Sequence, residues 1–257
     1  MLSELTSGQR QLALAFLVLL GFVGLFVAGF GGMPADITRL TVYDWPDLVE
    51  QVLDTSGATP AGVGVPDLSE SRGFYESYVD MLWFWLERCR TSHAPLVEKM
   101  VLFWHGHLCS SIEKVWQRQW LFDQNQVLRT LGLGNFEDLV QAVSVTPAML
   151  AYLDNNTNVA GAPNENFARE LMELFTLGEG HYSEQDVKEA ARAFTGWGID
   201  GETGEFAFRP GLHDDGPKTI LGKTAPFDGG DVIDLLLEQP QTAQTIVRKL
   251  WQEFISP

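Results

Sequence analysis

The sequence predicts an all-α fold, an irregular multi-helix domain preceded by one apolar helix. After residue 33, Pro, Gly and Ser residues divide the chain into short segments with helical spacing of apolar side chains and almost no strand-like alternation. Of the 257 residues, 45% are hydrophobic and 11% are aromatic, which is enough for a packed core. This composition excludes collagen-like, low-complexity and wholly disordered chains.

The apolar helix is expected from residues 12–32, which read LALAFLVLLGFVGLFVAGFGG and contain no polar side chain. A helix of this length spans roughly 30 Å, the thickness of a bilayer core. We therefore expect residues 1–33 to be a membrane anchor or a cleaved export signal, with a buried soluble helix or a faulty start to the sequence as alternatives. An anchor would make the membrane a partner through residues 12–32. With an anchor or a signal, the protein is membrane-anchored or exported and the bulk of the chain lies outside the cytoplasm.

Residues 34–257 are expected to form the helical domain, beginning with two short helices at residues 34–40 and 46–54. Each of these helices opens with Pro, whose missing N–H is harmless in the first helical turn. Residues 55–72 are rich in Gly, Pro and Ser and are expected to form a flexible loop.

A helical hairpin of residues 73–92 and 95–111 is expected next, because both segments are rich in Trp and aliphatic residues. If the turn lies between them, Cys109 is roughly 16 Å along the helix from the point opposite Cys89. A disulfide requires Cα atoms within about 7 Å, so we expect two free, buried thiols.

Capping signals define the helices further along the chain. Asn164 is expected to cap a helix that ends before Gly178, and Ser183 with Asp186 is typical of a capping box for the next helix. Residues 205–209 are the only plausible strand. The remaining helices are expected at residues 123–131, 136–144, 147–153, 230–238 and 241–255.

The charge pattern and the missing motifs exclude several function classes. The chain has 34 acidic and 17 basic residues, a net charge of −17, so it should repel a phosphate backbone and no nucleic acid is expected as a partner. Its two cysteines lie in no CxxC motif, which excludes a zinc ribbon or a thioredoxin-type site. HExxH and GxSxG motifs are missing, and there is no Glu-x-x-His of the kind that dimetal bundles require.

One helix carries the main candidate site, because Asn166, Arg169, Glu170 and Glu173 fall on one stripe in a regular helix. The stripe has two interpretations. It could be a solvated face with ordinary ion pairs. It could also be a buried site in which Glu170 and Glu173 bind a metal or act as acid and base, while Arg169 holds one of them ionised.

Two histidine-containing segments are candidates for the same site. His105 lies in an apolar helix and is either a hydrogen-bonded core residue or a ligand, whereas His107, two residues on, should point to the opposite side. His213 and Asp214 lie in a loop constrained by Gly and Pro. We expect Glu170, Glu173, Arg169 and His105 as catalytic candidates. The candidate ligands of a divalent metal are His105, His213, Asp214 and Glu170.

Four segments form an ordered series of motifs: PLVEKMVLFWHGHL (95–108), PAMLAYLDNNTN (147–158), PNENFARELMELFTLGEGHYSEQDVKEAARAFTGW (163–197) and HDDGPKTILG (213–222). Together they resemble the bacterial family called domain of unknown function 1800. The resemblance begins near residue 28 and continues to the last residue. It implies a mainly helical, often exported protein and carries no established activity or residue roles. Members of that family usually continue beyond the segment KLWQEF (249–254), so the resemblance implies a member truncated at its C-terminus.

Two functions therefore remain open from the sequence. The protein could be an uncharacterised cell-envelope or exported enzyme with a His/carboxylate site of the metal-dependent or acid/base type. Alternatively, it could be a non-catalytic binding or scaffolding module whose polar stripe only fixes helix packing and whose exposed Trp residues contact a polymer or partner. Convergence of the candidate side chains in one cleft would favour the enzyme.

Overall fold

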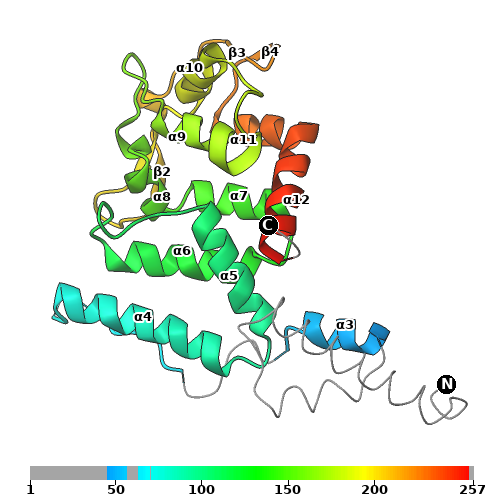
Figure 1. Cartoon of the computed structure of the whole chain (residues 1–257). Coiled ribbons are helices and arrows are strands. Elements are labelled where there is room, and N and C mark those ends of the chain that lie inside the picture. The colour runs from blue at the N-terminus through cyan, green and yellow to red at the C-terminus, as the bar shows by residue number, and fades with distance from the viewer. Residues whose placement is uncertain (1–44, 57–62, 70, 255–257) are drawn as a thin grey trace, which may run out of the picture. The chain divides into compact units, whose positions relative to one another are not determined.

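The computed structural model describes residues 45–56, 63–69 and 71–254, and these residues form mainly helices (Figure 1). The expectation of an all-α fold is correct for most of the described chain and wrong in one respect. Two small antiparallel sheets of two strands each lie in the second half of the sequence. The apolar helix expected at residues 12–32 and the short helix expected at residues 34–40 lie outside the described residues.

The described helices can be compared with the length and hydropathy that a membrane span requires. Within residues 45–56, 63–69 and 71–254, no helix is both long enough and apolar enough to cross a bilayer.

The chain divides into two compact units, Met1–Leu102 and Phe103–Pro257, and the division falls within helix α5. The first unit contains α3 (Trp45–Leu53), α4 (Phe74–Thr91) and the beginning of α5 (Pro95–His107). These helices agree with the expected short helix and hairpin, although α5 ends four residues before the expected residue 111. The described residues between α3 and α4 form neither helix nor strand, as their Gly, Pro and Ser content predicts.

A buried ion pair joins the two helices of the hairpin. Arg88 Nε donates to Glu98 Oε1 at 2.7 Å, and the two side chains are only 7% and 0% exposed. Glu98 on α5 therefore has its partner on α4. Truncating one member of such a pair leaves the other charge buried without compensation, so loss of either side chain should destabilise the packing of α4 against α5.

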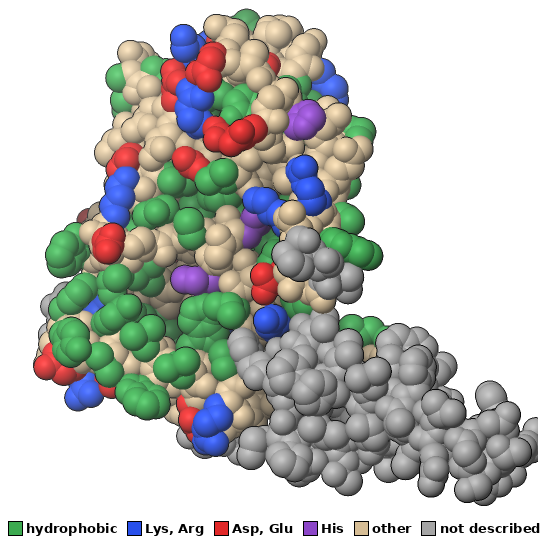
Figure 2. All heavy atoms as spheres, in the orientation of Figure 1, with side chains coloured by type: hydrophobic (Ala, Val, Ile, Leu, Met, Phe, Trp, Pro, Cys, Tyr) green, Lys and Arg blue, Asp and Glu red, His purple; other side chains and the backbone are tan. Residues whose placement is uncertain are grey.

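One face of α4 exposes apolar side chains. Tyr75, Trp83 and Leu86 are 72%, 66% and 59% exposed. Figure 2 shows hydrophobic side chains gathered over this helix.

The second unit contains the remaining helices in a tightly packed arrangement. Helix α6 packs against α7 and α8, and α11 packs against α7, α10 and α12. Asn135 caps α7 by accepting from the N–H of Glu137, and the capping box of Ser183 and Asp186 opens α10 as expected. The helices after α5 are α6 (Arg118–Leu131), α7 (Phe136–Ser144), α8 (Pro147–Tyr152), α9 (Asn166–Glu170), α10 (Glu184–Ala193), α11 (Gly229–Leu237) and α12 (Pro240–Phe254).

The two sheets are short hairpins, one of which contacts α8 through its strand β1 and the other α10 through its strand β3. Strand β2 (Phe206–Phe208) is the expected strand, and it pairs with β1 (Trp197–Ile199), which was not expected. Strands β3 (Lys218–Ile220) and β4 (Lys223–Ala225) pair across a tight turn. Each strand has only three residues, too few to show the alternation that identifies a strand in a sequence.

The core of the second unit joins α7, α8, α9, α10 and α11. Each of these helices contributes fully buried apolar side chains to this core. Examples are Leu139, Leu150, Phe167, Leu171, Val187 and Ile233, all between 0% and 1% exposed.

The helix expected from Asn164 to residue 177 changes its winding midway. The expected cap is displaced by one residue: Glu165 is the N-cap residue and makes no side-chain capping hydrogen bond, while the Asn164 side chain, one residue earlier, accepts from the N–H of Asn166 at 3.0 Å. After Glu170 the chain continues as a π-helix, Leu171–Thr176, and it leaves the helix at Gly178, whose φ is +86°. A π-helix is wider than an α-helix and is frequently found at functional sites.

Candidate functional site

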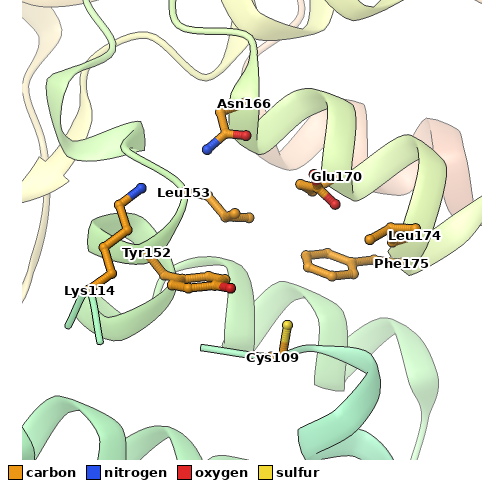
Figure 3. A pocket seen from close by; sticks show the side chains of 8 residues that line it. All are labelled: Cys109, Lys114, Tyr152, Leu153, Asn166, Glu170, Leu174 and Phe175. Carbon is orange, nitrogen blue, oxygen red and sulfur yellow. The ribbon is translucent and has the colours of Figure 1, made fainter. Parts of the chain in front are cut away.

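A pocket of about 370 Å³ lies beside the junction of α9 and the π-helix. Figure 3 shows that Asn166 and Glu170 enter it from one helix, whereas Tyr152 and Cys109 enter it from the opposite side. Both polar and apolar side chains line the pocket, and its volume falls within the range of small-molecule sites. The lining residues are Cys109, Lys114, Tyr152, Leu153, Asn166, Glu170, Leu174 and Phe175.

Three separate segments build this pocket. Tyr152 and Leu153 lie at the end of α8, and Cys109 and Lys114 lie in the connection between α5 and α6. Asn166, Glu170 and Leu174 follow one another at intervals of four residues on α9 and the π-helix. This interval places the three side chains on one helix face, which forms a wall of the pocket.

The polar stripe expected on this helix is divided between two environments. Arg169 faces away from the pocket, and its guanidinium donates to both carboxylate oxygens of Glu184 at 2.8 and 2.7 Å and to Glu165 at 3.1 Å. Glu173 accepts a hydrogen bond from the Tyr182 hydroxyl at 2.7 Å. Neither residue lines the pocket. Of the three charged residues on the stripe, only Glu170 does.

Glu170 is the chemically distinctive group of the pocket. Within the described part of the chain, its carboxylate forms no hydrogen bond and no ion pair. Burial raises the pKa of this carboxyl, the negative charge of Glu173 raises it further, and Arg169 partly opposes the rise. A carboxyl with a raised pKa and no structural partner is suited to exchanging a proton or pairing with a ligand.

Tyr152, Cys109 and Lys114 supply the other polar groups. Burial raises the pKa of the Tyr152 hydroxyl, and the Cys109 thiol and the charge of Glu170 raise it further. The Nζ of Lys114 donates to Asp154 Oδ2 at 2.6 Å and lies 5.9 Å from the centre of the Tyr152 ring. The charge of Lys114 is therefore already paired with a carboxylate, and the charge of Glu170 is not.

Cys89 and Cys109 form no disulfide, as expected, but neither is fully buried. Cys89 lies on α4, and Cys109 lies at the pocket.

His107 holds the end of the π-helix. Its Nε2 donates to the carbonyl of Phe175 at 3.0 Å, so its Nδ1 is left to accept from Lys249 Nζ at 3.1 Å. Lys249 also donates to the carbonyl of Leu174 at 2.8 Å, and Thr245 Oγ1 donates to the carbonyl of Leu177 at 2.9 Å. Side chains from α5 and α12 thus satisfy carbonyl groups at the end of this helix.

The electrostatics of His107 follow from its surroundings. The ring is 8% exposed and packs near Phe103, Trp104 and Phe175. Burial lowers the pKa of His107 to about 4, and the positive charge of Lys249 contributes to the decrease. The imidazole is therefore neutral at pH 7. The sequence favours His105 as the functional member of the HGH triplet, whereas the structure identifies His107 as the histidine that supports the pocket wall.

His105 is half-buried on α5 and does not line the pocket. Burial lowers the pKa of its imidazole.

His213 and Asp214 belong to a loop that hydrogen bonds hold in place. His213 Nδ1 donates to the carbonyl of Thr195 at 2.8 Å. Asp214 accepts two hydrogen bonds from Arg192, at 2.8 and 3.1 Å, and this guanidinium lowers the pKa of the carboxyl. The fully buried Lys218 donates to the backbone carbonyl of Asp214 at 2.5 Å. Neither His213 nor Asp214 lines the pocket.

The four expected metal ligands do not come together. In the part of the chain that the structure describes, no group of three or more His, Cys, Asp or Glu side chains could hold a metal ion. His105, His213, Asp214 and Glu170 all belong to this part. Glu170 alone of the four lines the pocket.

Most of the pocket was not expected from the sequence. Cys109 was interpreted as a core thiol, and Lys114 and Tyr152 had no expected role. Tyr152 lies in the segment PAMLAYLDNNTN, which the resemblance singles out, so the sequence carried a weak signal for it. No local pattern marks Lys114, because it reaches the pocket only through the fold.

Comparison with known proteins agrees with the resemblance seen in the sequence motifs. Neither a search of curated proteins nor a search of solved structures found a match to the chain. One family model, described as a protein of unknown function (DUF1800), matches residues 25–257 and so covers most of the chain. The chain therefore belongs to the DUF1800 family.

Proposed function

We propose that the protein is an enzyme that acts on a small molecule by acid/base catalysis at Glu170. One observation carries this proposal: Glu170 is a carboxylate that lines a pocket and has no hydrogen bond or ion pair among the described residues. The neighbouring charged residues, Arg169 and Glu173, have structural partners.

The environment of Glu170 supports this role. Burial and the charge of Glu173 raise the pKa of Glu170 above its ordinary value, which makes the carboxylate a stronger base. The Tyr152 hydroxyl and the Cys109 thiol face the same space and can donate hydrogen bonds to a substrate (Figure 3). General acid/base catalysis of this kind typically contributes about 10²- to 10⁴-fold in rate.

The proposal can be tested with an unbiased set of substrates. The purified full chain is incubated with a mixture of cellular metabolites, and mass spectrometry follows which compounds are consumed and formed. We expect a substrate that the natural protein consumes and that Glu170→Gln consumes at least about 100-fold more slowly.

Glu179→Gln is the matched control, because Glu179 is an exposed carboxylate that follows the π-helix and lies outside the pocket. This variant should retain turnover. Equal turnover by Glu170→Gln, or no change in any metabolite with the natural protein, would contradict the proposal.

A binding module without catalysis is the second candidate, and the exposed apolar face of α4 favours it. Tyr75, Trp83 and Leu86 are each more than half exposed. Tyr and Trp side chains are enriched at the centres of protein interfaces. A binding module would tolerate Glu170→Gln and lose its partner on Trp83→Ala, so the two candidates predict opposite results.

We further propose that the protein acts at or beyond the membrane, with residues 12–32 as its anchor or export signal. The length and apolar composition of this run support the proposal. If the run is an anchor, the full chain should partition with membranes, whereas a chain beginning at Pro34 should not. Recovery of both chains in the soluble fraction without detergent would count against the anchor.

A further inference from the structure

We infer that the pocket beside α9 binds a small organic amine, whose ammonium group pairs with Glu170 and whose apolar part packs on Leu174 and Phe175. This inference rests on the same pocket as the proposed acid/base function and names the class of molecule that the pocket takes.

The charges around the pocket are the first observation that favours a cationic ligand. Glu170 is a carboxylate without a partner among the described residues, and Lys114 is the only Lys or Arg in the lining. The Nζ of Lys114 lies 2.6 Å from Asp154 Oδ2, so an incoming anion would have to compete with a carboxylate already in contact. The uncompensated charge at the pocket is therefore negative, which favours a cation.

Hydrogen-bonding capacity agrees with this sign. The Asn166 side chain, one turn before Glu170, donates through Nδ2 to Asp154 at 3.5 Å. Its Oδ1 remains available as an acceptor on the face that also presents the Glu170 carboxylate (Figure 3). An ammonium group carries only donors, so two acceptors on one helix face match its chemistry.

The remaining walls fit the rest of an amine. Leu153, Leu174 and Phe175 provide apolar surface, and the Tyr152 ring lies opposite Leu174 and Phe175 (Figure 3). Aromatic faces attract organic cations through their quadrupole. The net charge of −17 on the whole chain also favours the approach of cations over that of anions.

The inference can be tested with one amine and two molecules of similar shape. The amine probe is 3-methylbutylamine, the neutral analogue is 3-methylbutan-1-ol and the anionic analogue is 3-methylbutanoate. Saturation-transfer NMR with the purified full chain measures binding of each compound. For a ligand of this size we expect a Kd on the order of 1 mM for the amine.

The alcohol should bind at least about tenfold more weakly than the amine, because it lacks the charge-assisted hydrogen bond. The carboxylate should show no binding. Equal binding of amine and alcohol, or preferential binding of the carboxylate, would overturn the inference.

Two variants test the role of Glu170 directly. Glu170→Gln has nearly the same shape as the natural side chain and should weaken amine binding about tenfold or more. Glu179→Gln removes an exposed carboxylate outside the pocket and should change the Kd less than about threefold. An unchanged Kd in Glu170→Gln would overturn the inference.

The pH dependence of the natural protein provides a measurement that needs no variant. Amine affinity should rise with pH as Glu170 loses its proton and should then stay constant while the amine remains protonated. Affinity independent of pH between 4 and 7 would contradict pairing with a carboxylate. The charged and titratable groups near Glu170 are Glu173 and Arg169 on its own helix, Tyr152 and Asp154 at the end of α8, and Cys109 and Lys114 after α5.

The Cys109 thiol gives a second test that does not depend on weak binding. In a Cys89→Ser background, trimethylammonium-ethyl methanethiosulfonate should modify Cys109 faster than the sulfonatoethyl reagent, after both rates are normalised to those with free mercaptoethanol. Glu170→Gln should reduce this ratio. A ratio of one in the Cys89→Ser protein that keeps Glu170 would contradict a negative pocket.

The two proposals fail in different ways. Amine binding that depends on Glu170, without turnover of any metabolite, supports the inference and counts against the enzyme. Turnover of a substrate without an amino group, in a pocket that rejects the amine probe, overturns the inference and leaves the acid/base function standing.

Discussion

Protonation of His107 should destabilise the protein in mildly acidic solution. In the structure the ring is 8% exposed, its Nε2 donates to Phe175, and its Nδ1 faces the ammonium group of Lys249 at 3.1 Å. A proton added to Nδ1 would remove this hydrogen bond and place two positive charges in contact. The neutral form of His107 is therefore the form that the folded protein requires.

The magnitude follows from the pKa of His107, which falls from its ordinary value of 6.5 to about 4 in the folded protein. Between these values the unfolded chain binds a proton that the folded chain excludes, so the stability rises with pH. The contribution is complete above pH 6.5 and is lost as the pH falls towards 4. The difference corresponds to about 3 kcal/mol in the free energy of unfolding.

Urea denaturation followed by Trp fluorescence, at several pH values from 4 to 7, measures this contribution. Carboxylates and His105 titrate in the same range, so the natural protein must be compared with His107→Gln, which can still donate to the carbonyl of Phe175. The variant should be less stable at pH 7, because it loses ring packing. Its deficit should shrink by about 3 kcal/mol between pH 7 and pH 4.

His181→Gln is the control, because His181 is exposed. This variant should follow the pH dependence of the natural protein. If the difference in free energy of unfolding between the natural protein and His107→Gln stays constant from pH 4 to 7, the reasoning is refuted, because the fold then does not disfavour protonation of His107.

Three further predictions concern stability and the thiols. Glu98→Gln should lower the free energy of unfolding, measured by urea denaturation, by about 3–5 kcal/mol. The double variant with Arg88→Met and Glu98→Leu should recover most of the lost stability, because it leaves no buried charge. A double variant as unstable as the single one would argue against the pair. Asp214→Asn should cost about 1 kcal/mol at pH 7, because its ion pair is partly exposed, and the cost should disappear in acid as the natural carboxyl is protonated. Cys89 and Cys109 should both react with a maleimide in urea without reductant, and fewer than two titratable thiols would contradict the free state.

Local signals in the sequence were sufficient for most helices of the described chain. Helix α7 lies at the expected residues 136–144, and α11 and α12 are each displaced by one residue from the expected ranges. The capping box at Ser183 was visible directly in the sequence. These features depend on side chains within one turn of the backbone they stabilise, so local patterns can identify them.

Helix α6 shows where local signals fail. It begins at Arg118, five residues before the expected start at Asp123. Its N-cap residue, Gln117, makes no side-chain capping hydrogen bond, so no sequence signal marks the beginning. Packing against α7 and α8 stabilises the helix instead, and this packing cannot be deduced from α6 alone.

The pocket depended almost entirely on the tertiary structure. The sequence showed that Glu170 shares a helix with Arg169 and Glu173, but a periodic pattern cannot tell which of these charges receives a partner. The partners, Glu184 and Tyr182, come from beyond the helix, and the groups opposite Glu170 come from two other segments. The π-helix likewise has its end carbonyls bound by side chains of α5 and α12. Such features depend on hydrogen bonds between residues that are distant in sequence and on the burial of side chains by other segments. These interactions form only when the chain folds, so a local sequence pattern does not reveal them.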